Sequence, residues 1–423
     1  MPSFTRRSFL QTAGVAAAAH ALSGSALAAP GDRVRHAIIG TGGQGGSHAK
    51  AFSANPDCEI VAVCDVDTDR RTRLAAALPN ADTVKLYDDF RKLLEVADID
   101  SVSVVTPDHW HTPIALAALK AGKHVYVEKP CCHNVREGQL LVAAQQKTGL
   151  CVQHGTQNRS TASTREAVQL LRDGVIGKVR LAKAINHQLR EPIGRTPDSA
   201  PPAGVNYDMW LGPAPVRPFS KNRFHYNWHW HWDYGTGDIG NDGIHQMDVA
   251  RWGLGTGIPK AVSASGGQLF YNDDHETPDT QIVTYEYDSC YLVFEMRLWT
   301  DYLLEGHDNG VVFYGDNGTL EVGRRGVRIS PLKGEKREFG TGPDLSANVR
   351  NFLDCVKTGS PAGLNAPISE GAISAQLCHF GNVATRVNRK LHIDAATVTC
   401  TGDDEANKLF SREYRKGYEL VEV

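Results

Sequence analysis

The sequence lacks the features that mark several classes of protein. Its charge is nearly balanced, with 45 Lys and Arg against 48 Asp and Glu, and it has no basic patch or arginine-rich tract for binding nucleic acid. Beyond the N-terminus, no segment approaches the roughly 20 apolar residues that a membrane-spanning helix needs. Internal repeats and low-complexity segments are also absent. We therefore expect no nucleic-acid partner and, once the N-terminus is removed, no membrane association.

Paired cysteine motifs are missing as well. The chain has nine cysteines, an odd number, and none forms a C-x-x-C pair. Cys64, Cys151 and Cys290 lie in apolar strand candidates, where a small buried side chain is the usual interpretation. The adjacent Cys131 and Cys132 are unusual, and a redox role for them stays open.

The N-terminus predicts the compartment. Thr5-Arg6-Arg7-Ser8-Phe9-Leu10-Gln11 resembles a twin-arginine export signal, and an alanine-rich segment with a small-residue cleavage site, Ala26-Leu27-Ala28, follows it. The alternative is a cytosolic N-terminus with two chance arginines. We expect residues 1–28 to be a signal peptide and the mature protein to be periplasmic, exported in its folded state.

The most informative motif is a glycine turn after a short apolar strand. Ala37, Ile38 and Ile39 lead into Gly40-x-Gly42-x-x-Gly45, and a helix-compatible segment follows. The first glycine permits a tight turn, the second lets the backbone approach a pyrophosphate, and the third lets helix and strand pack closely. The free N–H groups of the helix N-terminus then face the phosphates. We predict that a dinucleotide binds to Gly40, Gly42, Gly43, Gln44 and Gly45.

Asp65 ends the second apolar strand, twenty residues after the last glycine of the turn. A carboxylate there can bond both ribose hydroxyls of NAD and would repel a 2′-phosphate. Arg70 and Arg71 follow closely and could accommodate NADP. NAD is the expected cofactor and NADP the alternative. Because no free nicotinamide pool is expected outside the cytoplasm, we expect the cofactor to be tightly held and to be reset within the site.

Short apolar strands alternate with helix-compatible segments over residues 33–155. Strands are expected at 35–39, 59–64, 83–86, 101–105, 124–127 and 150–153, with helices at 47–54, 68–78, 89–96, 113–121 and 135–147. This alternation predicts an α/β Rossmann domain, a doubly wound parallel sheet with helices on both faces.

The pattern changes after residue 155. Long β-prone segments at 261–271, 281–287, 291–299, 310–314 and 319–322 are separated by turn residues, which predicts a large open, mostly antiparallel sheet. Helices are expected at 239–252, 345–357 and 369–389. We assign residues 156–395 to an α+β substrate and oligomerisation domain, and residues 396–423 to a C-terminal tail.

Polar residues follow two strands of the predicted parallel sheet, where ligands of such sheets bind. Thr106, Pro107, His109 and His111 follow the fourth strand, and Glu128-Lys129-Pro130 follows the fifth. A lysine after a buried strand is rarely structural, since an unpaired buried ammonium is expensive. It can hold a reacting hydroxyl oxygen, with Glu128 orienting it. The alternative is a solvated strand end with an ion pair.

These motifs resemble those of the family of glucose-fructose oxidoreductase, inositol dehydrogenase and rhizopine-catabolism oxidoreductases. The resemblance rests on the glycine turn, Thr106-Pro107-x-x-x-His111, Glu128-Lys129-Pro130 and the segment from Gly237 to Asp248, and it covers nearly all of the mature chain. It implies a Rossmann domain followed by an α/β domain whose open sheet forms a homodimer or homotetramer interface. It also implies chemistry on a sugar or polyol, with Lys129 as a catalytic residue and Thr106, Pro107, His109, His111, Glu128 and Lys129 near the cofactor.

His245 is the expected proton-transfer partner, because histidine titrates near neutrality and the resemblance places it in the family's motif. Many members carry aspartate four residues before it, but this chain has Asn241. Asparagine can position a hydroxyl group but cannot accept a proton. Asp242 is adjacent, yet on a helix it points about 100° away. We list Lys129, His245 and Asn241 as catalytic candidates.

An aromatic segment, Phe224 to Tyr234, suggests a sugar pocket with flat rings beside polar groups. An aromatic core loop is the alternative. His229 and His231 would share a face on an extended segment, but no second paired motif completes a metal site, and we expect none. The substrate candidates are Asn158, Arg159, Trp228, His229, Asp242 and His245.

Two enzyme classes and one other class therefore remain. The first, which the sequence favours, is an NAD(P)-dependent oxidoreductase acting on a sugar or polyol. The second is an NAD-dependent glycoside hydrolase that uses transient oxidation, elimination and re-reduction. The third is a sugar sensor or assembly protein with a degenerate cofactor site, against which the intact glycine turn and Lys129 argue.

Overall fold

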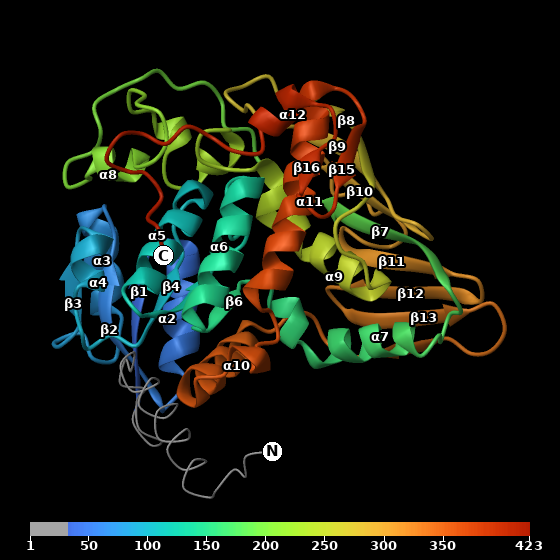
Figure 1. Ribbon diagram of the computed structural model, residues 1–423, viewed down its shortest axis with the longest axis horizontal. Helices are drawn as coiled ribbons and strands as arrows, with labels where there is room; N and C mark the ends of the chain where they lie inside the picture. The colour runs from blue at the N-terminus through green and yellow to red at the C-terminus, as the bar shows by residue number, and fades with distance from the viewer. Residues whose placement is uncertain (1–32) are drawn as a thin grey trace, which may run out of the picture.

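The alternating strands of the N-terminal half form a six-stranded parallel sheet (Figure 1). In this computed structural model, which describes residues 33–423, the proposed signal peptide lies outside the described residues. The strands are β1 (Val34–Ile39), β2 (Cys58–Cys64), β3 (Lys85–Tyr87), β4 (Ser101–Val104), β5 (His124–Val127) and β6 (Val152–His154). Their order is β3-β2-β1-β4-β5-β6. The order reverses between β1 and β4, which creates a ligand crevice beyond their carboxyl ends.

The helices of this half lie close to their predicted positions. They are α2 (Gly43–Ser53), α3 (Thr68–Ala76), α4 (Phe90–Leu94), α5 (Asp108–Lys120) and α6 (Val135–Thr148). The largest difference is in α5, which starts directly after Pro107 and contains Pro113, the residue at which the sequence predicted its start. The predicted α/β Rossmann fold is confirmed.

The second half forms a ten-stranded sheet in the order β14-β13-β12-β11-β7-β10-β9-β8-β15-β16. Strands β7 and β10 pair in parallel, and the other neighbours are antiparallel, which confirms the expected open, mostly antiparallel sheet. The strands are β7 (Val179–His187), β8 (Ala261–Gly267), β9 (Thr280–Glu286), β10 (Tyr291–Arg297), β11 (Asn309–Gly315), β12 (Gly318–Gly323), β13 (Gly326–Pro331), β14 (Arg337–Phe339), β15 (Leu391–Asp394) and β16 (Thr399–Cys400).

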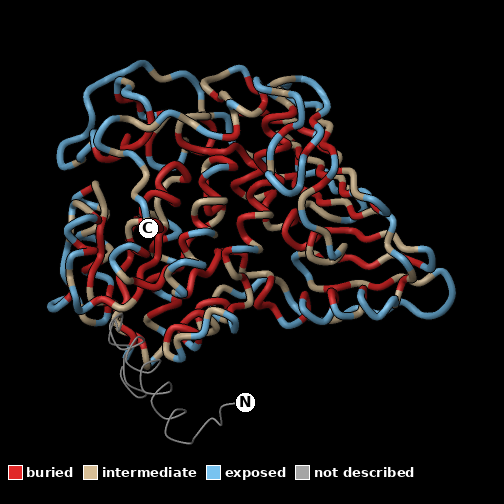
Figure 2. Tube along the Cα trace, viewed as in Figure 1, coloured by how far each residue is buried: buried red, intermediate tan, exposed pale blue. Residues whose placement is uncertain are grey.

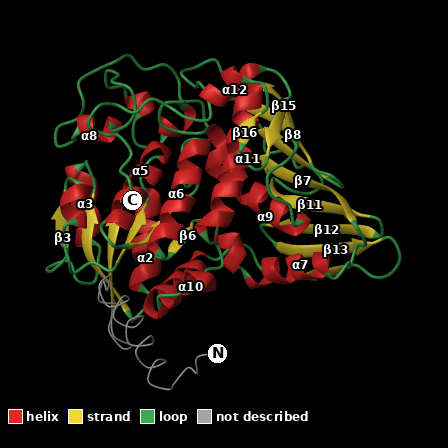
Figure 3. Cartoon of the chain, in the orientation of Figure 1, coloured by secondary structure: helices red, strands yellow, loops and turns green. Residues whose placement is uncertain are grey.

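The helices of the second half are α7 (Ala162–Arg172), α8 (Tyr207–Leu211), α9 (Ile244–Leu254), α10 (Leu345–Thr358), α11 (Ile368–Val387) and α12 (Asp404–Lys408). Figure 3 shows α6, α9 and α11 between the two sheets, with the other helices of the second half around them. Short 3₁₀ turns occur at η1 (Gln157–Ser160), η2 (Lys221–Arg223), η3 (Asn227–Trp230) and η5 (Pro361–Gly363), and η4 (Ile239–Gly243) is π-helical. Figure 2 shows that α9, α11 and the inner strands are largely buried, whereas the outer loops are exposed.

Helix α10 completes the Rossmann half although it comes late in the chain. Phe352 packs edge-on against Phe52 of α2 and Tyr126 of β5, with ring centroids 6.2 and 5.7 Å apart. Asn348 donates to the Tyr126 hydroxyl at 2.8 Å. The apolar cluster beneath the dinucleotide turn therefore contains side chains from both halves of the chain.

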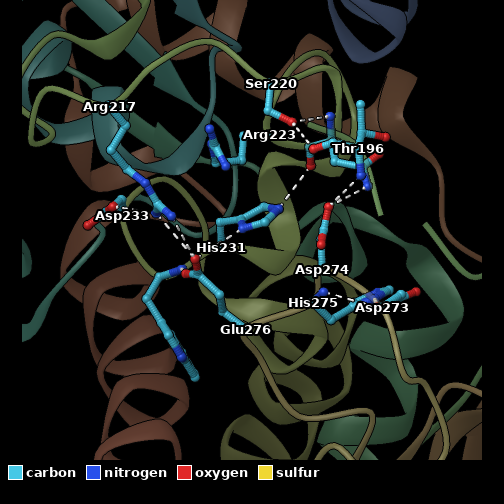
Figure 4. Close-up of polar contacts among 12 residues, drawn as sticks. Thr196, Arg217, Ser220, Arg223, His231, Asp233, Asp273, Asp274, His275 and Glu276 are labelled. Carbon is cyan, nitrogen blue, oxygen red and sulfur yellow. Dashed lines mark hydrogen bonds and ion pairs between the residues drawn. The ribbon is translucent and has the colours of Figure 1, made fainter. Parts of the chain in front are cut away.

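A long connection between β7 and η4, residues 188–236, extends over the carboxyl edge of the parallel sheet (Figure 1); we call it the bridging loop. The Thr68 N–H donates to the Gly204 carbonyl at 3.1 Å, which ties this loop to the Rossmann half. Its other end is held by charged contacts to Glu276, which lies outside the loop (Figure 4): His231 lies 3.3 Å and Arg217 lies 3.2 Å from that carboxylate. The loop is therefore anchored on both sides of the crevice.

The cysteines match the expectation of small buried side chains. All nine cysteines are buried and unpaired. The Cys131 and Cys132 sulfurs are 3.9 Å apart, and the Cys131 thiol together with burial raises the pKa of Cys132. A buried thiol that resists ionisation is a poor redox group. Over residues 33–423, no helix is both long and apolar enough to cross a membrane.

Candidate active site

A cavity of about 410 Å³ lies at the carboxyl ends of β1, β4 and β5, under the bridging loop. That volume is typical of sites for small molecules and cofactors. Most of the predicted cofactor residues line it: Gly40, Gly42, Gly43, Gln44, Asp65, Thr106, Pro107, His111, Glu128 and Lys129. Asn241, Trp228 and His229 contribute from the second half of the chain. The fold thus brings most of the predicted cofactor residues to one cavity, together with Asn241, Trp228 and His229 from the second half.

The glycine turn has the shape that a pyrophosphate needs. Gly40 has a positive φ of 97°, and a Cβ there would lie 2.3 Å from the Val105 carbonyl oxygen. Gly45 lies behind the turn, where a Cβ would lie 2.2 Å from the Gly40 oxygen. At the open side, Gly43 has nothing within 4 Å of its Cβ position, and no side chain caps the first N–H groups of α2. Free donors beside open space fit a bound diphosphate.

Asp65 follows directly after β2 and lines this cavity, as predicted. Its carboxylate accepts from the Thr41 N–H at 2.7 Å, the Thr41 hydroxyl at 2.9 Å and the Asp67 N–H at 2.9 Å. Burial raises the pKa of Asp65, and these bonds act in the opposite direction. Arg70 lines the cavity too, whereas Arg71 turns away and donates to the Asp65 carbonyl at 2.9 Å.

The two histidines at the start of α5 occupy different environments. His111 lines the cavity and links the ends of β4 and β5, since its ring nitrogens lie 2.7 Å from the Thr106 carbonyl and 2.6 Å from the Pro130 carbonyl. His109 does not line the cavity. Its Nε2 lies 3.0 Å from the Trp210 carbonyl, and its ring packs against Trp210 and Tyr234. The helix turns these two side chains in different directions, so the predicted cofactor contact of His109 has no geometric support.

Lys129 is held by the π-helical turn before α9. Its Nζ donates to the Asn241 carbonyl at 2.6 Å and lies 3.3 Å from the Asn241 amide oxygen. Asn241 in turn donates to Asp238 at 2.9 Å, and Arg190 donates to the same carboxylate oxygen at 2.9 Å. Burial raises the pKa of Asp238, and Arg190 opposes that effect. The lysine amine therefore has a fixed position between the two halves of the site.

His245 lies in the first turn of α9, one turn beyond Asn241 of η4, but unlike Asn241 it does not line the cavity. Its Nδ1 is buried and has no hydrogen-bond partner among the described residues. Burial lowers the pKa of His245 to about 4, and the nearby Lys129 charge acts in the same direction. A neutral ring with a free nitrogen is able to accept a proton.

The aromatic segment forms one wall of the cavity. Trp228 and His229 line it with their rings stacked, the centroids 3.6 Å apart. The sequence predicted that His229 and His231 share a face, which is wrong: this stretch is the 3₁₀ turn η3, and His231 turns toward Glu276 and the Asn222 carbonyl (Figure 4). No cluster of three or more His, Cys, Asp or Glu side chains over residues 33–423 could hold a metal ion.

Three predicted substrate residues lie away from the cavity wall. The Asp242 carboxylate accepts from Gln188 and Asn309 and faces the ten-stranded sheet. Arg159 is buried in an ion pair with Asp248 at 2.8 Å, so its guanidinium is already neutralised. Asn158 lies in η1 beside it, partly exposed and outside the cavity lining. These positions give the three residues no contact with a ligand in this cavity.

Three residues of the site were missed by the sequence analysis. Asp108, the first residue of α5, lines the cavity and accepts from the Thr236 hydroxyl at 2.8 Å. His225 lines it from the bridging loop, 3.6 Å from Asp67 and with a positive φ of 56°. Asp238 supports Asn241. Asp108 and Asp238 lie inside the quoted motifs, but only the fold shows that their side chains turn toward the site.

Comparison with known proteins agrees with the fold and the dinucleotide turn. Residues 34–156 match the model of an oxidoreductase family with an NAD-binding Rossmann fold, and residues 193–420 match that family's C-terminal alpha/beta domain. A solved structure with the same fold is the WlbA dehydrogenase from Bordetella pertussis in complex with NADH and UDP-GlcNAcA. It has a TM-score of 0.65 and 17% sequence identity, and the match covers 86% of this chain and 99% of that one.

Curated relatives match over shorter stretches. A glycosyl hydrolase family 109 protein from Saccharopolyspora erythraea is 40% identical over 168 residues, which is 38% of this chain and 36% of the relative. The dTDP-3,4-didehydro-2,6-dideoxy-alpha-D-glucose 3-reductase from Streptomyces antibioticus is 37% identical over 134 residues, 32% of this chain and 40% of the reductase. The chain thus spans less than half the length of these relatives.

Proposed function

Because the chain belongs to the oxidoreductase family of glucose-fructose oxidoreductase, inositol dehydrogenase and rhizopine-catabolism oxidoreductases, and has its NAD-binding Rossmann domain, we propose that it oxidises or reduces a carbon of a sugar or polyol. The observation that carries this proposal is the position of Lys129. Its amine is held by Asn241 at 2.6 Å, on the wall of a cavity that also contains the dinucleotide turn.

Bound NAD would supply the hydride acceptor for the carbinol carbon. Lys129 donates a hydrogen bond to the reacting oxygen and stabilises the negative charge that develops as the hydroxyl proton leaves. His245, whose ring stays neutral because burial lowers its pKa to about 4, takes that proton. In the reverse direction the same groups return the proton to the carbonyl oxygen. Asn241 accepts no proton; it fixes the amine through its two oxygens.

The wall formed by Trp228 and His229 suits a sugar or cyclic polyol. Apolar C–H patches of a sugar ring pack against flat aromatic faces, and nearby polar groups bond the hydroxyls. Tyr226, which lines the same wall and is 53% exposed, leaves that side open to an entering ligand. These features support a ring-shaped substrate without naming the sugar or the carbon that reacts.

Redox-assisted glycoside cleavage is the second candidate, and the names of several relatives support it. The relative from Saccharopolyspora erythraea carries the name glycosyl hydrolase family 109 protein. In such a reaction the enzyme would oxidise a ring carbon, the acidified neighbouring C–H would lose its proton as the aglycone leaves, and water addition and re-reduction would follow. Lys129 and His245 would serve both oxidation and re-reduction.

We also propose that the protein is exported to the periplasm in its folded state with the cofactor bound. The twin-arginine-like N-terminus supports this location. The bridging loop, anchored on both sides of the cavity, supports tight retention of the cofactor. A homodimer or homotetramer through the open sheet is part of the same proposal, supported by the outward-facing Ile282 and Tyr291, 47% and 48% exposed.

The test uses the purified full-length protein, Lys129→Met and a matched control, Lys120→Met, which removes an exposed lysine on α5. Bound nicotinamide is measured by absorbance and fluorescence, and then free sugars, polyols and aryl glycosides are supplied separately. We expect reduction of the bound cofactor by one of the free sugars or polyols, about 10²-fold slower in Lys129→Met and unchanged in Lys120→Met. Aryl alcohol release without net reduction identifies the second candidate. Absence of nicotinamide binding, or full activity of Lys129→Met, would overturn the proposal.

A further inference from the structure

A chain of polar side chains runs through the apolar interior of the Rossmann half. His36 of β1 lies 2.8 Å from the Ser101 hydroxyl through Nδ1 and 2.8 Å from the Ser103 hydroxyl through Nε2. Ser103 of β4 lies 3.0 Å from Nδ1 of His48 on α2, and Nε2 of His48 lies 2.8 Å from Glu128. The two serines and two histidines are 0% exposed, so the whole chain is closed to solvent.

The contacts fit one direction of hydrogen bonding. An ionised Glu128 is only an acceptor, so Nε2–H of His48 donates to it. Nδ1 of His48 then accepts from the Ser103 hydroxyl, whose oxygen accepts from Nε2–H of His36. Nδ1 of His36 accepts from Ser101, the far end of the chain. Every donor points toward Glu128, and every member is satisfied.

The chain ends at the wall of the dinucleotide cavity. Glu128 lines that cavity, and its second carboxylate oxygen accepts from the Lys129 N–H at 3.1 Å. Gln44, from the glycine turn, donates to the carboxylate at 3.1 Å. Behind it, a Cβ on Gly155 would lie only 2.9 Å from a carboxylate oxygen, so the side chain has no room to swing back. Glu128 is therefore fixed on three sides.

Stability alone does not account for this arrangement. Apolar side chains of similar volume stabilise a core at least as well as a buried polar network does. His36 already stacks on Phe52, with ring centroids 3.8 Å apart, as an apolar ring could. The polar atoms contribute something else: they carry a fixed set of donors from the protein interior to a carboxylate at the cofactor site.

The groups around Glu128 also favour its ionised form. Burial alone would raise its pKa, but the hydrogen bond from His48, the Lys129 charge and the Gln44 amide bring that pKa well below its usual value. The titratable groups that interact electrostatically with this carboxyl include no second carboxylic acid among those with the largest effects: Tyr126, Lys129, His48, His111, His154 and His245. Of these, His48 makes the direct side-chain bond.

We propose that Ser103, His36 and His48 form a buried relay that holds Glu128 as an oriented anion on the wall of the cofactor cavity, which makes His48 a positioning residue for the reaction centre. An anion fixed there accepts hydrogen bonds from hydroxyl groups of the dinucleotide and holds the backbone of Lys129 in place. The expected effect on NADH binding rests on the proposed function, but the charge state of Glu128 can be measured without any ligand.

The two serines provide a matched pair of variants. Ser101→Ala and Ser103→Ala remove the same atom from the same strand, at the same burial, and each removes one bond to His36. Only Ser103 also contacts His48. His48→Leu removes the donor to Glu128, and His48→Gln restores an N–H at the end of the side chain. Thermal melting of the four variants reports their stability separately.

The first measurement is infrared titration of the protein without added ligand. The band of a protonated buried carboxyl is assigned to Glu128 by its loss in the matching Glu128→Gln background. Because His48 favours the ionised form, its loss raises the pKa of Glu128, and the carboxyl then protonates as the pH falls. We expect the band in His48→Leu and Ser103→Ala at about pH 6, and its absence in wild type, Ser101→Ala and His48→Gln.

The second measurement is NADH affinity, from fluorescence titration at about pH 6 and pH 8.5. We expect binding to weaken about 10-fold in His48→Leu and about threefold in Ser103→Ala at the lower pH, and to recover at the higher pH. If Ser101→Ala and Ser103→Ala bind NADH equally well at both pH values, or if the loss of affinity in His48→Leu does not depend on pH, the relay has a purely structural role and the proposal is overturned. If wild type binds no NADH, the proposed function fails, and the infrared result still decides the state of Glu128.

Discussion

Asp108 gives the most direct physical test of the cavity wall. It is the first residue of α5, 1% exposed, and its carboxylate accepts from the Thr236 hydroxyl at 2.8 Å. Burial raises the pKa of Asp108 to about 7, against the opposing effects of Thr236 and Lys129. The ordinary value of an aspartate is 3.8. This acid therefore keeps its proton in the folded protein over a range of pH in which the unfolded chain has lost it.

Replacing Asp108 with asparagine removes this titration and keeps the shape of the side chain. A rise of about 3 pKa units at about 1.4 kcal/mol each corresponds to ~4 kcal/mol of free energy of unfolding. Because the folded-state pKa is the higher one, the favourable contribution is complete below about pH 4 and is lost as the pH rises to about 7. Asp108→Asn should therefore gain stability relative to wild type across that interval and keep the full gain above it.

The assay is urea unfolding of wild type and Asp108→Asn at several pH values between about 5 and 8.5. The difference between the two proteins cancels the titration of the other groups. An exposed control, Asp82→Asn, should show no such trend. A difference that stays constant with pH would refute the assignment of a protonated Asp108 to the cavity wall.

Two further predictions concern the glycine turn and the buried ion pair. Gly45→Ala places a methyl group 2.2 Å from the Gly40 oxygen and should weaken NADH binding by at least about 10-fold in fluorescence titration. The control Gly46→Ala, whose added methyl group has nothing within 4 Å, should bind NADH normally. Equal affinities of the two variants would contradict a pyrophosphate at this turn. Arg159→Met leaves Asp248 buried without its partner and should cost about 3–5 kcal/mol in urea unfolding. The double variant Arg159→Met, Asp248→Asn should recover part of that loss, and failure to do so would point to lost packing instead.

The Rossmann half could be predicted closely because its signals are local. Each strand is a short apolar segment, each helix follows directly, and the glycines of the turn lie within a few residues of each other. The cavity residues at the ends of β4 and β5 followed from the rule that ligands bind beyond the carboxyl ends of parallel strands. Asp65, Thr106, Glu128 and Lys129 all lie there.

The second half was less predictable because its decisive contacts are distant in sequence. The sequence pattern did not predict β7 (Val179–His187), which contains polar residues and alanines and pairs with β10 and β11, more than 100 residues later. It also missed α7 (Ala162–Arg172) before it. The strand is central to the sheet only because its partners arrive later, and no local pattern contains that information.

The same limit applies to side-chain directions in the site. The segment 239–252 was expected to be one helix, but Ile239–Gly243 is π-helical, which turns Asn241 toward Lys129. The 3₁₀ turn η3 separates His229 from His231 in a similar way. Whether a short segment is α-, π- or 3₁₀-helical depends on the surrounding packing. The motif therefore identified the residues, but only the fold determined what each side chain faces.

The position of α10 bears on how the protein is made. Because Phe352 packs on Phe52 and Tyr126, the first half of the chain lacks part of its own interior until about residue 356 has left the ribosome. Synthesis from N- to C-terminus thus leaves the dinucleotide domain with uncovered aromatic rings for more than half of translation. Chaperones that bind nascent apolar surface have a defined target during that interval, and the domain matures only when the last third of the polypeptide folds back onto it.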